Sequence, residues 1–290
     1  MTAPQGDQLP SSMRKYAKGW RNWSRKNRLA SMDSTARAGL CGTGGTVVEG
    51  ICPSGLPGDG ASGTAPASST LASPSPCPPL SHPQERKQRL LEILRLLLTL
   101  PKEEGILFQD ETEVHLNPKV GFAWMRRGKQ QLLPTPGTNQ KAVLSGGLNW
   151  RSGRLVLVTG ARRATDLFCA FLEQVRTRLR RYRKIHVITD QDRSHISKAA
   201  KAYLKHWKHR LEVHLLPAWS PDANPMEVIW LVLHQTITVN HSEVTLGDLV
   251  TYARQFLEEC QPFHLKLPKV YEPLMRQLKK GSVQLSCVPI

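Results

Sequence analysis

The sequence predicts an α/β fold in which a mixed sheet is flanked by helices and preceded by a disordered N-terminal segment. Short apolar runs separated by turn residues come first, and strands alternating with helices follow, which is typical of a mixed sheet covered by helices. The chain has 290 residues, of which 40% are apolar. That is enough for one full domain with an appendage, or for two small domains.

The first 83 residues are expected to form a low-complexity, disordered segment. From about residue 38 onward, Gly, Ser, Ala, Thr and Pro dominate, as in "GASGTAPASST" and "SPSPCPPLSHP". With so few large apolar side chains to bury, this stretch cannot offset its own chain entropy. The basic run that precedes it, residues 14–28, is either an unstructured arm or a contact to nucleic acid through Trp20, Trp23 and its charges.

Regular structure is expected to begin at Gln84. Leucine density and charge spacing predict an amphipathic linker helix over residues 84–104. The main domain is expected over residues 105–262, followed by a C-terminal tail over residues 263–290. Its predicted strands occupy residues 105–111, 121–130 (running into a turn), 141–150, 153–160, 184–190 and 211–217, and its predicted helices occupy residues 165–182, 197–208, 224–237 and 245–260.

The charge balance predicts a polyanionic partner. Forty Lys and Arg against 23 Asp and Glu give a formal net charge of +17 and a pI near 10.0, which favours nucleic acid over an anionic membrane surface. The sequence has no apolar leader and no run of about 18 apolar residues, so a secreted or membrane-spanning protein is not expected. We therefore predict a cytoplasmic, DNA-associated protein.

The six cysteines lie far apart, without a CxxC pair or a nearby histidine at ligand spacing. We predict that they are reduced thiols and that the protein has no zinc site.

Three carboxylates occupy comparable positions along the predicted sheet. Asp110 and Asp190 each end a predicted strand, and Glu227 opens a helix just after another. Groups at the carboxyl ends of strands collect along one rim of an open sheet, where ligands bind. Three close anions repel one another unless a cation lies among them, and Mg²⁺ prefers such oxygen ligands. Two such ions about 3.5–4 Å apart would suit phosphodiester chemistry.

Each of these acids also has an ordinary structural explanation. Aspartate is common where a strand gives way to a turn. In "NPMEV", Asn224 suits an N-cap, Pro225 the first helical position and Glu227 the third position of a capping box. One glutamate can begin the helix and also face the rim.

The blocks that contain these acids resemble a known family. "FQDET" with Asp110, "VITDQDRSHISKA" with Asp190 and "LLPAWSPDANPMEVIW" with Glu227 are similar to the three blocks of DDE transposases of the mariner-like superfamily, in its prokaryotic insertion-sequence branch. The resemblance covers roughly residues 84–260. It implies a ribonuclease-H-like core in which Asp110, Asp190 and Glu227 are the catalytic, metal-binding acids.

The same resemblance implies a reaction and its partners. The reaction is metal-dependent cleavage and strand transfer of DNA. The cofactor would be Mg²⁺, with Mn²⁺ as a substitute, and it would bind as two ions. The partners would be double-stranded DNA, as transposon ends and target, and a second copy of the chain in an active homodimer.

Two departures from the family pattern stand out. Family members usually carry Asn after the second Asp, whereas this chain has Gln191 and then Asp192, which makes Asp192 a weaker candidate ligand. The family normally has helix-turn-helix modules before the core, and residues 1–83 show no apolar periodicity suited to them. One hypothesis is that this stretch is a frame-shifted reading of a lost DNA-binding domain.

Basic residues after Asp190 form a candidate DNA track. Lysines recur at intervals of three, four and three, so they are expected on one helix face, which is either a solvated face or a phosphate track. His195 would contact a phosphate or order the acid pocket. Trp124, Trp150 and Trp230 are expected in the core. The predicted DNA-binding residues are Arg193, His195, Lys198, Lys201, Lys205 and Lys208.

Two classes of function remain open from the sequence. The first is an enzyme, a metal-dependent transposase, and the second is a catalytically silent remnant that still binds DNA through its basic surface. A ribonuclease or junction resolvase on the same fold would share the acids but fits "WSPDANPME" less well.

Overall fold

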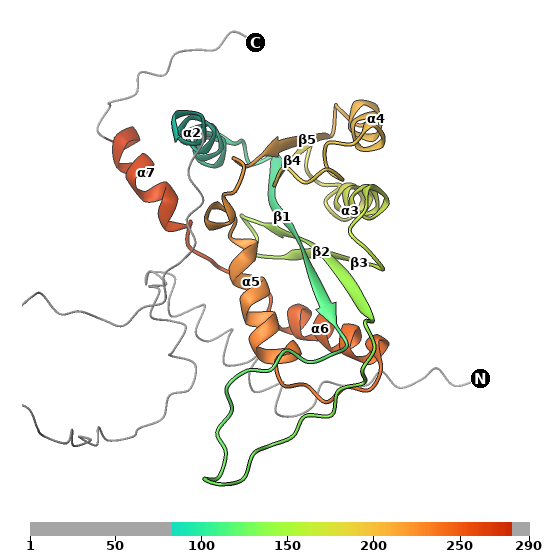
Figure 1. Ribbon diagram of the computed structural model, residues 1–290. Helices are drawn as coiled ribbons and strands as arrows, with labels where there is room; N and C mark the ends of the chain where they lie inside the picture. The colour runs from blue at the N-terminus through green and yellow to red at the C-terminus, as the bar shows by residue number, and fades with distance from the viewer. Residues whose placement is uncertain (1–82, 280–290) are drawn as a thin grey trace, which may run out of the picture. The chain divides into compact units, whose positions relative to one another are not determined.

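The computed structural model describes residues 83–279, so the expectations for the N-terminal 82 residues, including the basic run with Trp20 and Trp23, lie outside the described residues. A five-stranded mixed sheet in the order β3-β2-β1-β4-β5 forms the centre (Figure 1). Strand β1 pairs with β2 in antiparallel fashion and with β4 in parallel, and β4 pairs in parallel with β5. The strands are β1 (Glu104–His115), β2 (Lys141–Asn149), β3 (Leu155–Gly160), β4 (Lys184–Thr189) and β5 (Leu211–Leu215).

Helices cover both faces of this sheet, as the sequence predicted. On one face, α3 (Thr165–Arg178) and α4 (Lys198–His206) bury the apolar stripe of α3 against β1, β4 and β5. On the other face lie α2 (Pro83–Thr99), α5 (Met226–Leu233), α6 (Leu246–Cys260) and α7 (Glu272–Lys279), which form the larger apolar cluster (Figure 1). Consecutive strand residues point to opposite faces, so even-numbered residues of β1 and β4 face the α5 side.

Packing extends beyond residue 262, where the sequence analysis ended the main domain. Phe263, Tyr271 and Leu274 are buried in the larger apolar cluster, so this part of the chain is not a tail. Tyr271 is the last residue of a short 3₁₀ helix that precedes α7. The hydroxyl of Tyr271 donates a hydrogen bond to the backbone oxygen of Ala223, 3.3 Å away. The described C-terminal residues thus brace the loop that leads into α5.

The segment between β1 and β2 differs from its prediction. Residues 121–130 are irregular rather than a strand, and Trp124, expected in the core, is 91% exposed. The aromatic and apolar letters of "GFAWM" suggested burial, but no strand pairs with them. Trp230 is buried as predicted, whereas Trp150 is half-buried and meets Phe108 edge-to-face at 5.4 Å.

Two further expectations can be compared with the structure. Cys169 and Cys260, the two cysteines in the described part, are not in disulfides. Between residues 83 and 279, no helix combines the length and the apolar character that crossing a bilayer requires.

Candidate active site: the acid rim

Strand register brings Asp110 beside Asp190. The sequence analysis placed Asp110 at the end of a short strand, but β1 continues to His115 through its pairing with β2. The parallel pairing of β1 with β4 ends at Phe108 opposite Ile188, so two residues further along each strand the same register aligns Asp110 with Asp190. The rim therefore lies where β4 ends, although β1 does not end there.

Glu227 reaches this rim because the loop before α5 is anchored to β1. The Asn224 side chain is buried, donates from Nδ2 to the Gln109 backbone oxygen at 3.0 Å, and accepts from the Met226 backbone N–H at 3.2 Å. Helix α5 begins at Met226 with Pro225 as its N-cap, one residue later than expected, so Asn224 contacts the first helical N–H from outside the helix. The expected capping box does not form, because the Asn224 backbone N–H donates to the Pro221 backbone oxygen. The carboxylate of Glu227 is exposed and is not used as a cap. We call Asp110, Asp190 and Glu227 the acid rim.

Asp110 is held between the sheet and α5. The Trp230 indole N–H donates to Asp110 Oδ2 at 3.1 Å, and the Glu111 backbone N–H donates to Oδ1 at 2.8 Å. Gly146, opposite Asp110 on β2, makes room for this indole, since a Cβ there would lie 2.7 Å from the Trp230 ring. Desolvation, with the charges of Glu227 and then Asp190, raises the pKa of Asp110 to about 7.

Desolvation also raises the pKa of Glu227, and the charge of Asp190 adds to the effect. Electrostatic repulsion thus links all three members of the acid rim. This is the convergence that the strand-end pattern predicted.

Asp190 is compensated by a buried histidine. His195 is 5% exposed, and its Nδ1 lies 2.8 Å from Asp190 Oδ1 while its Nε2 lies 3.8 Å from Glu111 Oε1. Burial opposes the charge on His195, but the contact with Asp190 and the nearby carboxylate of Glu111 outweigh it and raise the pKa of His195 to about 9. Burial likewise opposes ionisation of Asp190, yet the His195 hydrogen bond and charge leave the pKa of Asp190 lowered.

The burial of His195 also distinguishes between its two predicted roles. A side chain this far from solvent favours ordering of the acid pocket over a phosphate contact, and both roles stay predictions. Its ring lies 4.3 Å from the ring of Phe168 on α3, and its Nδ1 contacts Asp190.

Two residues, one at the acid rim and one in the loop that leads to Glu227, were not identified from the sequence. The charge of Arg163, in the loop after β3, opposes the rise in the pKa of Asp110 and of Glu227 and contributes to the lowered pKa of Asp190. Its Nη2 donates a hydrogen bond to the Glu111 backbone oxygen at 3.1 Å. Trp219, in the loop before α5, is 82% exposed and has a φ of 54°. A large residue in the left-handed region is strained, and such strain concentrates at functional sites.

The candidate DNA track is partly on a helix. Lys198, Lys201 and Lys205 are exposed and recur along α4, which Ser197 caps by accepting the Ala200 backbone N–H at 3.2 Å. Lys208 lies in the turn after α4, which ends at His206, so the expected single helix face holds three of the four lysines.

The loop between β4 and α4 holds the other two residues considered there. Arg193 is exposed. Asp192 Oδ1 accepts hydrogen bonds from the backbone N–H and hydroxyl of Ser194, at 2.7 and 2.6 Å, which gives Asp192 a role in shaping this loop.

The acid rim suits a hard divalent cation by its donor chemistry. All three side chains offer carboxylate oxygens, the ligands that Mg²⁺ prefers. The raised pKa values of Asp110 and Glu227 reflect a local surplus of negative charge that a cation would relieve. Within residues 83–279, however, the only triplet whose ligand atoms all lie within 4.8 Å of one another is His186, Glu212 and His214. The acid rim is therefore more open than a single three-ligand shell.

The fold and the rim define the class of protein. Residues 105–249 match the family model described as DDE superfamily endonuclease, and the chain belongs to this family. The core is a ribonuclease-H-like mixed sheet with flanking helices, as predicted from the resemblance.

The chain is similar in sequence to an insertion-element protein and in fold to a mariner protein. It is 33% identical over 178 residues to the "Insertion element IS630 uncharacterized 39 kDa protein" of Shigella sonnei, a match that covers 61% of this chain and 52% of the relative. The chain thus spans about half the length of this curated relative. The crystal structure of the mariner Mos1 paired end complex with Mg has a TM-score of 0.51 at 12% identity, covering 99% of this chain and 84% of that chain.

Proposed function

We propose that this protein is a transposase that cleaves and joins DNA strands in a metal-dependent reaction at Asp110, Asp190 and Glu227. The observation that carries the proposal is the convergence of three carboxylates, one from β1, one from the residue after β4 and one from α5, at a place where burial and then the charges of Glu227 and Asp190 raise the pKa of Asp110 to about 7. Stability alone does not favour such a cluster, because like charges held together destabilise the fold. Membership of the DDE superfamily endonucleases supports the same reaction.

Each member of the rim has a distinct task in this proposal. Asp110, Asp190 and Glu227 would hold Mg²⁺ or Mn²⁺, and a pair of ions does not require all three carboxylates in one shell. Bound metal supplies the charge stabilisation that the attacking and leaving oxygens of a phosphodiester require. His195 carries a proton at neutral pH, so it orients Asp190 rather than accepting a proton from water.

Exposed basic residues beside the rim would carry the DNA. Lys198, Lys201 and Lys205 on α4, with Arg193 and Lys208 at its two ends, offer positive charge without reading sequence. Trp219 presents an exposed aromatic ring in the loop that leads to Glu227, where a base freed from its stack would find a stacking partner. The partners would be transposon ends and target DNA, bound by a homodimer.

The proposal is tested by nicking of supercoiled plasmid in Mg²⁺, Mn²⁺ and Ca²⁺. The parent protein is expected to nick with Mg²⁺ or Mn²⁺. Glu227→Gln is expected to reduce nicking at least about 100-fold, because a neutral amide is a poor ligand for a hard cation. Its free energy of unfolding should change by less than about 1 kcal/mol, since the carboxylate is not a cap in this structure.

Two controls separate the outcomes of this experiment. Glu258→Gln removes a carboxylate from α6, away from the rim, and should leave nicking unchanged. A Glu227→Gln variant that nicks like an active parent would remove Glu227 from the site. A parent that binds DNA but never nicks would favour the second reading, a silent DNA-binding remnant.

A further inference from the structure

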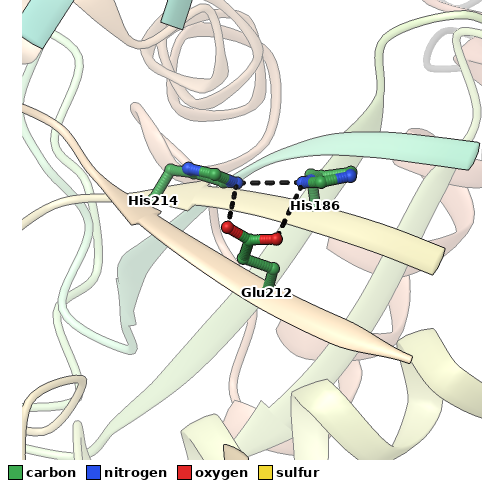
Figure 2. A group of neighbouring side chains, drawn as sticks. All are labelled: His186, Glu212 and His214. Carbon is green, nitrogen blue, oxygen red and sulfur yellow. Dashed lines mark hydrogen bonds and ion pairs between the residues drawn. The ribbon is translucent and has the colours of Figure 1, made fainter. Parts of the chain in front are cut away.

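A second group of potential metal ligands lies on β4 and β5, away from the acid rim. His186, Glu212 and His214, here called the histidine cluster, point toward one another from these two neighbouring strands (Figure 2). The parallel register sets His186 opposite Glu212, and His214 follows two residues along β5, so all three share one face. His186 Nδ1 lies 2.9 Å from His214 Nε2. The Glu212 carboxylate contacts both nitrogens at 3.7 Å, through Oε2 to His186 Nδ1 and through Oε1 to His214 Nε2.

The remaining nitrogen of His186 is already held by a carboxylate. His186 Nε2 lies 3.0 Å from Glu104 Oε2, and Glu104 is buried and also paired with Arg183. With its Nε2–H donated to Glu104, His186 keeps the lone pair of Nδ1 toward the cluster. A carboxylate behind a histidine is the arrangement that orients histidines in metal sites.

The carboxylate of Glu212 is oriented in a similar way. Lys184 Nζ contacts Glu212 Oε2 at 2.5 Å, which leaves Oε1 on the side of His214. His186 and Glu212 are thus each held by a partner outside the cluster, and His214 points its Nε2 toward them. Glu104 on β1 and Lys184 on β4 lie opposite each other in the parallel register, so both residues that support the cluster are strand residues of the sheet.

We propose that His186 Nδ1, His214 Nε2 and Glu212 Oε1 bind a divalent transition metal ion of the Zn²⁺ class. In tetrahedral coordination with bonds of about 2.0–2.1 Å, neighbouring ligand atoms lie about 3.3 Å apart. His186 Nδ1 and His214 Nε2 are 2.9 Å apart and His214 Nε2 is 3.7 Å from Glu212 Oε1, so these two separations bracket this value. The 3.7 Å contact of His186 Nδ1 is to the other oxygen, Oε2, so the carboxylate would also turn to bring Oε1 toward His186. His214 would move its proton to Nδ1 and present the Nε2 lone pair.

The ligand chemistry separates this ion from the metal of the acid rim. Two imidazoles and one carboxylate suit Zn²⁺ and its neighbours, whereas Mg²⁺ prefers oxygen ligands. His186 precedes Asp190 by four residues on an extended chain, a distance of ~13 Å at ~3.3 Å per residue. The side chains of His214 and Glu212 are 27% and 42% exposed, which leaves water access to a fourth position.

The consequence of binding would be a clamp on the sheet edge. Strand β5 is the last strand of the sheet and is held laterally by β4 alone. An ion shared between His186 on β4 and two residues on β5 would tie this edge strand to its neighbour. Binding to the folded state alone raises the melting temperature.

The full-length protein is tested by titration with Zn²⁺ or Co²⁺ in excess Mg²⁺, against a chromophoric chelator. His214→Gln and Glu212→Gln are each expected to remove one ion per chain or to weaken its binding at least about tenfold. Glu104→Gln, which removes the support behind His186, should weaken it about 10- to 100-fold. Co²⁺ at this site should give visible bands of a tetrahedral complex without thiolate charge transfer.

Matched variants locate the ion. His209→Gln, at an exposed histidine outside the cluster, and Asp190→Asn, at the acid rim, should bind Zn²⁺ as the parent does. Both substituted ligands are partly exposed, so the variants should fold, and far-UV circular dichroism checks this; Glu212→Gln decides if His214→Gln does not fold. Parent-like binding by a folded ligand variant would overturn the proposal, as would loss of the ion in Asp190→Asn.

Discussion

The histidine cluster and the acid rim are close along the chain, because Asp190 follows His186 by four residues just after β4 ends, but their charges are arranged in opposite ways. In the histidine cluster each group has a complementary neighbour: Glu104 faces His186, and Lys184 faces Glu212. In the acid rim, burial and then the like charges of Glu227 and Asp190 instead raise the pKa of Asp110 to about 7. Charges are balanced in the histidine cluster and unbalanced in the acid rim nearby. This difference indicates that the acid rim depends on a bound cation.

The largest effect on stability is expected from Asp110→Asn in metal-free protein. The folded-state pKa of Asp110, about 7, lies above its ordinary value of 3.8, so its favourable contribution is complete below pH 3.8 and is lost as pH rises through 7. At pH 8 the variant should be more stable than the parent by roughly 2–4 kcal/mol, and the difference should disappear near pH 4. Urea unfolding in EDTA at both pH values measures this.

Glu113→Gln on the same strand is the matched control for this prediction. A hydrogen bond from Lys141 lowers the pKa of Glu113, so this carboxylate is favoured as an anion. Its replacement should leave stability unchanged or lower it at pH 8. Equal effects of Asp110→Asn and Glu113→Gln would contradict the charge imbalance at the acid rim.

The second effect is expected from His195→Gln, which removes a buried cation that compensates charge at the rim. The folded pKa of His195, about 9, exceeds its ordinary 6.5, so its stabilising contribution is complete below pH 6.5 and is lost as pH rises through 9. At pH 6 the variant should be less stable by about 2 kcal/mol, since Glu111 is left buried and uncompensated.

Unfolding of the His195 variant at pH 6 and pH 9.5 checks the sign. The deficit should shrink at the higher pH, where the parent histidine is also neutral. His209→Gln, at an exposed histidine, should show no deficit at either pH. A deficit that is constant with pH would mean that His195 stabilises the rim by packing against Phe168 rather than by charge.

Much of this molecule follows from sequence periodicity and from where acids stand relative to strands. The alternation of apolar runs predicted the mixed sheet and its helices, and Asp190 follows β4 as expected. The length of β1 was not predictable from its own residues, because pairing with β2 extends it through "ETEVH". Trp124 was misplaced because an apolar residue in a loop has no periodicity that distinguishes it from a buried one.

The histidine cluster shows a second limit of sequence reasoning. His186 and His214 lie 28 residues apart, and only the register of β4 with β5 brings them together. Cysteine spacing predicted no zinc site, and a search for nearby histidines is blind to pairs joined across strands. Arg163 was missed for the same reason, because its loop meets the rim only through the fold.

The smallest effect per residue is expected from the lysines on and just after α4, in the salt dependence of DNA binding. Their replacement tests which of the two sites, the acid rim or the histidine cluster, faces DNA. Helix α4 packs on the sheet face that holds Val187, whereas the histidine cluster shares the opposite face with Ile188. DNA along α4 would therefore reach the acid rim without passing over the histidine cluster. Each lysine that neutralises one phosphate contributes about 0.9 to the slope of log Kobs against log salt concentration.

Replacing Lys198, Lys201, Lys205 and Lys208 by Ala should flatten that slope by about 1–3, measured by fluorescence anisotropy with a duplex of arbitrary sequence. Three exposed lysines elsewhere are the control (Lys87, Lys102 and Lys266), and their replacement should change the slope less per charge removed. His214→Gln, on the far face, should leave the slope unchanged. If the α4 variant keeps the parent slope, DNA does not lie along this helix, and the acid rim must be approached from the side of Arg163 and Trp219 instead.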